Sequence, residues 1–149
     1  MTVSGAVDFA QWAAPDLVLT LGERVYNVVP PSVEQARKVI ALAARGEVNL
    51  RIVRGKIPEA AQQVLATIGP LERPGLGDAA AQMMADGIPV ETIDRMHYYA
   101  IFYWTRGKEY ADALAVALWA PRADAPDGGD GPAPKARARS PRRSGRNTA

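Results

Sequence analysis

The apolar residues between positions 17 and 29 alternate along the chain in the way that the side chains of a β-strand do. Leu17, Leu19 and Leu21 recur every second residue, and a second apolar, β-branched run covers residues 25–29. Gly22 lies in the short segment between the two runs, which is typical of a tight turn. The pattern predicts a β-hairpin, which must pack on another element because an isolated hairpin is marginally stable in water.

Beyond the hairpin the apolar spacing changes to three and four residues, which predicts α-helices. Pro30 and Pro31 end the second strand, Ser32 with Gln35 forms a capping box, and Gly46 is expected at the C′ position of the first helix. The predicted helices cover residues 33–45, 58–68, 79–85, 89–106 and 108–119. Residues 47–56 fit either a short strand, which would extend the hairpin, or an extended connection.

The aromatic residues are concentrated in the last two predicted helices, where seven of the ten Trp, Tyr and Phe residues lie between Tyr98 and Trp119. The first half of the helix over residues 89–106 has one apolar face, whereas its second half is apolar almost all round. Such a helix is usually buried on both sides. We therefore expect this half to lie between the hairpin and the last helix.

Four aromatic residues of that half have two interpretations. They are either core residues or an exposed strip that receives another protein, because Tyr and Trp commonly anchor protein interfaces. The four candidate partner-binding residues are Tyr98, Tyr99, Phe102 and Tyr103.

No catalytic or cofactor-binding pattern is found in the sequence. His97, the only histidine, lies on an apolar helix face and is expected to be a core residue with a satisfied hydrogen bond. The chain has no cysteine, no G-x-S-x-G elbow and no complete P-loop. Asp124, Asp127 and Asp130 match no calcium loop. These observations favour a protein that is not an enzyme and has no cofactor and no metal.

The positive charge is concentrated at the C-terminus. Residues 121–149 carry seven Lys or Arg against three Asp, a net charge of +4, so the rest of the chain sums to −2. Pro, Gly and Ala dominate this tail, which predicts disorder. A weak alternative function is non-specific nucleic-acid contact through the tail, which lacks aromatic residues for base stacking. The basic residues concerned are Lys135, Arg137, Arg139, Arg142, Arg143 and Arg146.

Together these patterns predict an α+β, mostly α fold, in which an N-terminal β-hairpin packs on a bundle of about four to five short helices. We expect a loosely ordered lead-in over residues 1–15, one globular domain over residues 16–120 and the disordered tail over residues 121–149. The N-terminus does not resemble a signal peptide, and no apolar run approaches the length of a membrane span. A soluble protein in the cytoplasm is therefore expected.

Residues 83–114, MMADGIPVETIDRMHYYAIFYWTRGKEYADAL, resemble the C-terminal part of tail assembly chaperones from long-tailed phages and prophages of actinobacteria. The resemblance extends upstream through LVLTLGERVYNVVPPS and covers roughly residues 8–119. It implies a non-catalytic protein of the bacterial host cytoplasm that binds the tape measure protein and keeps it soluble, and that is absent from the mature virion. Members often have a longer form made by programmed ribosomal frameshifting, so a frameshifted form of the chain itself is a second expected partner, together with self-association.

Two other functions remain open from the sequence. One is a nucleic-acid-associated accessory protein that uses the basic tail, and the other is a minor structural virion or connector protein. A salt-dependent gel shift that compares the full chain with one ending at Trp119 tests the first, and the presence of the protein in purified particles tests the second.

Overall fold

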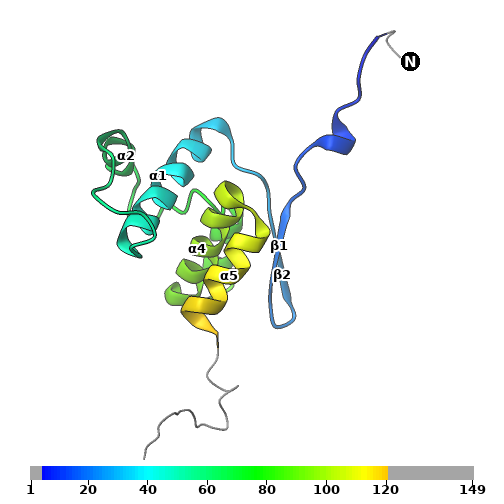
Figure 1. The fold of residues 1–149 in the computed structure, drawn as a ribbon. Helices are drawn as coiled ribbons and strands as arrows, with labels where there is room; N and C mark the ends of the chain where they lie inside the picture. The colour runs from blue at the N-terminus through cyan, green and yellow to red at the C-terminus, as the bar shows by residue number, and fades with distance from the viewer. Residues whose placement is uncertain (1–4, 121–149) are drawn as a thin grey trace, which may run out of the picture. The chain divides into compact units, whose positions relative to one another are not determined.

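The structure is a computed structural model that describes residues 5–120 (Figure 1). The described part of the chain divides into two units after Leu114. The fold described below is that of the first unit. The predicted tail, its aspartates and its basic residues lie outside the described residues.

The predicted hairpin is confirmed. Strands β1 (Leu17–Leu21) and β2 (Arg24–Val28) pair antiparallel, with Leu17 opposite Val28. Gly22 in the turn has a φ of 62°, which glycine adopts without steric cost. One face of the hairpin is buried through Leu17, Tyr26 and Val28, whereas its other face is exposed. The lead-in contains one short turn, a 3-10 helix over Ala10–Trp12.

The first helix, α1 (Val33–Asn49), is longer than predicted. Ser32 caps it as expected, because its Oγ accepts a hydrogen bond from the Gln35 backbone N–H. Gly46 does not end it. The helix instead ends in a Schellman motif, in which Arg51 occupies the C′ position with a φ of 64° and the Ile52 N–H donates to the Glu47 carbonyl. Residues 47–53 are therefore a helix end and a turn rather than a third strand.

A different constraint explains the glycine at position 46. A Cβ atom there would lie 2.9 Å from the Tyr98 hydroxyl and 3.0 Å from Cζ of Phe102. Glycine thus permits α1 to approach the aromatic side chains of a neighbouring helix closely. In the sequence, a glycine at this position is compatible both with the end of a helix and with a close contact between two helices.

The other helices follow the prediction with small shifts at their ends. They are α2 (Glu59–Leu65), α3 (Asp78–Ala85), α4 (Val90–Arg106) and α5 (Lys108–Trp119), so the chain has an α+β, mostly α fold. Pro58 and Pro89 precede α2 and α4 as N-caps, which suits the fixed φ of proline. Gly107, with a φ of 99°, separates α4 from α5.

Two groups of buried side chains form the core, and α4 contributes to both. The hairpin cluster joins β1 and β2 to α3 and α4, and the helix cluster joins α1 to α4 and to the start of α5. The hairpin cluster consists of Leu17, Tyr26, Val28, Leu76, Ala79, Ala80, Met83, Ile93 and Ala100. The helix cluster consists of Val39, Leu42, Ala43, Ile101, Phe102 and Ala111. The second half of α4 thus has α1 as a neighbour, which the sequence did not predict.

Candidate partner-binding site

The four predicted aromatic residues do not form one exposed strip. Phe102 is completely buried, so it is a core residue and offers no surface to a partner in this structure. Its ring packs edge-on against Tyr98, with centroids 5.2 Å apart, and stacks with Tyr110 at 5.7 Å. Tyr98, Tyr99 and Tyr103 are partly exposed. Phe102 therefore cannot belong to the predicted binding surface, whereas the three tyrosines are partly accessible.

The three tyrosines belong to two different environments. Tyr98 lines an open groove between α1, α2 and α4. Tyr99 and Tyr103 instead stack on each other, with centroids 6.3 Å apart, and the Tyr99 hydroxyl donates to the carboxylate of Asp112 on α5. Burial, together with this hydrogen bond, raises the pKa of Tyr99 far above its usual value. Tyr98 is thus the predicted aromatic residue that lies in a groove.

The groove has a volume of about 630 Å³ and contains both apolar and charged side chains. Its apolar surface comes from α1, α2 and α4, and its charged groups come from α1, the loop after α2 and the first half of α4. The lining residues that the argument below uses are Leu42, Arg45, Leu65, Ile68, Tyr98 and Ile101. Arg45 is exposed, whereas Leu42 and Ile101 are buried. The groove thus combines an apolar floor with a charged rim.

His97 fixes the loop that borders this groove. Its side chain is 8% exposed, and its Nε2 accepts a hydrogen bond of 3.0 Å from the Gly75 N–H. The Gly75 carbonyl in turn accepts from Nε1 of Trp104. Burial, with a further contribution from the charge of Arg73, lowers the pKa of His97 to about 4, so the ring is neutral at pH 7. The expectation of a core histidine with a satisfied hydrogen bond is confirmed.

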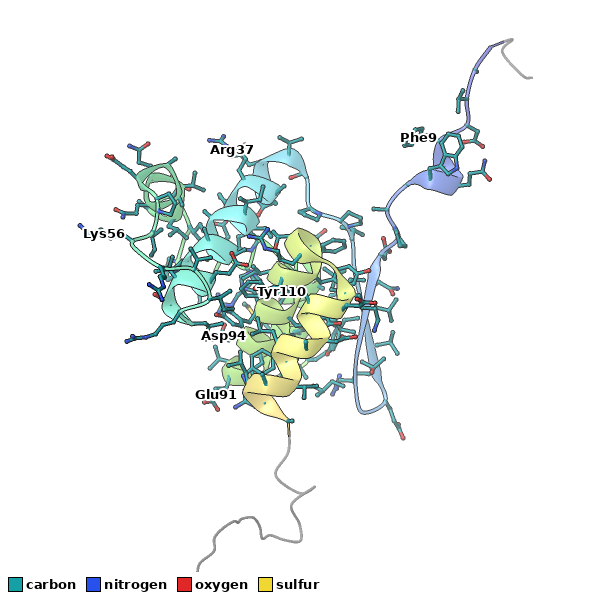
Figure 2. All side chains as sticks on the ribbon, viewed as in Figure 1. Phe9, Arg37, Lys56, Glu91, Asp94 and Tyr110 are labelled. Carbon is teal, nitrogen blue, oxygen red and sulfur yellow. The ribbon has the colours of Figure 1, made fainter. Side chains whose placement is uncertain are left out.

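Two ion pairs hold the same loop from both sides. Nζ of Lys38 on α1 donates to Glu72, whose other oxygen accepts from the Gly69 N–H. Nε of Arg73 donates to Asp94 on α4, which Figure 2 labels. The hydrogen bond from Lys38 lowers the pKa of Glu72. The border of the groove is therefore tied to both α1 and α4.

A buried carboxylate, which sequence reasoning missed, joins three helices. Glu47 on α1 is 5% exposed and accepts two hydrogen bonds from Arg106 at the end of α4, at 2.9 and 2.8 Å. The hydroxyl of Tyr110 on α5 donates to the same carboxylate at 2.9 Å. The hydrogen bonds from Arg106 lower the pKa of Glu47, although burial opposes them. A signal was present in the sequence, because Glu47 continues the four-residue spacing of Val39 and Ala43 on the apolar face of α1.

The described residues were searched for metal-ligand clusters and for membrane-spanning helices. Between residues 5 and 120, no group of three or more His, Asp or Glu side chains is arranged to hold a metal ion. No helix in that range combines the length and apolarity that crossing a membrane requires.

A family model described as a domain of unknown function, DUF7426, matches residues 7–149. Searches found no matching curated protein and no matching solved structure. The chain therefore belongs to the DUF7426 family.

Proposed function

We propose that this protein is a tail assembly chaperone of a long-tailed phage or prophage, which binds the tape measure protein and keeps it soluble while the tail assembles. In this role it is not an enzyme, acts in the cytoplasm of the bacterial host and is absent from the mature virion. The resemblance of residues 83–114 to such chaperones motivates the proposal. The structural observation that supports it best is the groove between α1, α2 and α4.

The groove has the chemistry of a site for an amphipathic helix. A helix that lies in a groove buries its apolar residues there and places its polar residues at the rim. Leu65 and Ile68 offer partly exposed apolar surface, and Arg45 provides a cation beside them. Tyr98 adds an aromatic side chain of the kind that frequently contributes most to interface affinity. A long helical partner could engage many copies of the chaperone in this way and gain avidity.

Co-expression with the tape measure protein of the same phage tests the proposal. We expect the wild-type chain to raise the soluble fraction of the tape measure protein. The variants Tyr98→Ala and Arg45→Glu change the wall and the rim of the groove. We expect Tyr98→Ala to weaken the complex at least about tenfold, because removal of an interface anchor typically costs about 2 kcal/mol, and Arg45→Glu to weaken it by a smaller factor, because a charge at the rim contributes less.

Arg37→Glu is the matched control, because Arg37 is an exposed cation on the same helix that does not line the groove (Figure 2). We expect this variant to bind as the wild type does. Circular dichroism establishes that each variant is folded. The proposal fails if the tape measure protein is equally soluble with and without the chain, and the groove assignment fails if Arg37→Glu weakens the complex as much as Arg45→Glu.

A further inference from the structure

The N-terminal arm, residues 5–16, presents apolar side chains to solvent although its turn is well formed. Phe9 and Trp12 are 65% and 60% exposed, and their rings pack edge-to-face with centroids 5.3 Å apart. Oδ1 of Asp8 accepts a hydrogen bond from the Ala10 N–H, which closes the turn beneath the two rings. An aromatic pair that is held in place before binding loses less conformational entropy when a partner covers it. The arm therefore has the properties of an interface anchor.

The charge of the arm is negative. Asp8 and Asp16 are its ionisable side chains, and it contains no Lys or Arg. Neither aspartate forms an ion pair within the part of the chain that the structure describes. A surface that complements the arm must therefore offer both cations and apolar area.

The cationic loop, residues 50–56, has those two properties. Arg51, Arg54 and Lys56 are exposed, and none of them forms an ion pair among residues 5–120. The loop contains no acidic residue, and its Ile52 and Val53 are 49% and 46% exposed. The loop also borders a surface hollow of about 670 Å³, lined in part by Arg51, Val53 and Arg54.

The backbone of the loop adds an argument that this charge is placed for binding. Arg51 has a φ of 64° at the C′ position of α1, where glycine is usual and where a side chain carries a steric cost. A glycine would end the helix with less strain but would remove a cation from the edge of the hollow. Strain retained at one residue of an exposed charged segment is typical of functional sites.

We propose that the cationic loop of one molecule binds the N-terminal arm of a second molecule of this chain. Phe9 and Trp12 pack on Ile52 and Val53, and the two aspartates of the arm lie against the cations of the loop. Because the two surfaces differ, the contact is heterologous, and one such contact leaves the arm of the first molecule and the loop of the second free. The inference does not depend on the proposed function, because its surfaces are separate from Tyr98 and Arg45.

Sedimentation of two charge-reversed chains, after nuclease treatment, tests the proposal. In the arm variant Asp8→Lys is combined with Asp16→Lys, and in the loop variant Arg51→Glu is combined with Arg54→Glu. We expect the wild-type chain to self-associate with rising concentration, and less so at high salt, which screens exposed charges. Each variant alone should be monomeric, because its arm and its loop carry the same sign. An equimolar mixture should associate again, because opposite charges then meet between molecules.

Controls separate this contact from a general effect of charge or aromatic surface. Glu23→Lys and Arg37→Glu change exposed charges outside both surfaces and should leave the association unchanged. Phe9→Ala with Trp12→Ala should weaken it at least about tenfold. A wild-type chain that is monomeric at all concentrations, association that disappears with nuclease, or a mixture of the two variants that stays monomeric would each overturn the proposal.

Discussion

The hairpin cluster and the helix cluster hold the same helix, α4, by different means. The hairpin cluster buries mainly aliphatic side chains; the Tyr26 hydroxyl contacts Asp86 at its edge, and the polar side chain buried beside it, His97, is neutral. The helix cluster combines aromatic rings with the buried carboxylate of Glu47. Apolar burial stabilises without directional requirements, whereas a buried charge requires all of its partners. We therefore expect the helix cluster to be more sensitive to the loss of a single polar group.

Removal of the Arg106 side chain should cause the largest loss of stability in the helix cluster. Arg106→Ala leaves the Glu47 carboxylate buried with only the Tyr110 hydroxyl as a partner, and we expect it to lower the free energy of unfolding by about 3 to 4 kcal/mol. Glu47→Gln should cost less, about 1 to 2 kcal/mol, because the Arg106 side chain that it leaves is 45% exposed and can be hydrated. Urea unfolding at pH 7 measures both values.

Lys108→Ala is the control for this experiment. It breaks an ion pair with Asp112 in which both side chains are solvent-exposed, 72% and 46%, so we expect a change of at most about 1 kcal/mol. If Glu47→Gln lowered the free energy of unfolding more than Arg106→Ala does, the buried carboxylate would not be the group that requires a partner.

The sequence predicted the hairpin cluster better than the helix cluster, and the reason is the range of the interactions. The alternation of Leu17 to Leu21 and the turn at Gly22 are local patterns, and each strand carries its own signal. The hydrogen bonds of Glu47 join residues that are 59 and 63 positions apart, and no local pattern indicates such a partner. The partly exposed tyrosines and the buried Phe102 belong to one apolar run in the sequence, and only the packing of residues from α1 and α5 around the Phe102 ring distinguishes them.

Acid should affect the two clusters in different pH ranges. His97 holds Gly75, which directly precedes the buried Leu76 of the hairpin cluster, and it is the only histidine of the chain. Its pKa is about 4 in the folded state, against 6.5 for an ordinary histidine, so the unfolded state binds the proton more readily. Stability should be complete above pH 6.5 and should fall by about 3 kcal/mol as the pH is lowered to 4. The Glu47 pKa is lowered, so the helix cluster should lose its ion pair only below pH 4.5.

His97→Gln distinguishes this effect from general acid destabilisation. Glutamine keeps an acceptor for the Gly75 N–H but does not titrate. We expect the stability of this variant, measured by urea unfolding at a series of pH values, to be nearly constant between pH 7 and pH 5, where that of the wild type declines. If the stability of both proteins declined equally between pH 7 and pH 5, a group other than His97 would cause the decline.

The smallest expected effect concerns Gly46, where helix propensity and packing oppose each other. In the interior of a helix alanine is more favourable than glycine by about 1 kcal/mol. At this position, however, the added methyl group would lie 3.0 Å from a carbon of the buried Phe102 ring, and overpacking of that kind costs about 1 to 3 kcal/mol. We expect Gly46→Ala to destabilise the protein by about 1 kcal/mol. In a Phe102→Leu background, whose side chain is shorter, the same substitution should cost less, because only the contact of 2.9 Å with the Tyr98 hydroxyl remains. Equal effects of Gly46→Ala in the two backgrounds, measured by urea unfolding, would mean that the Phe102 ring does not determine this residue.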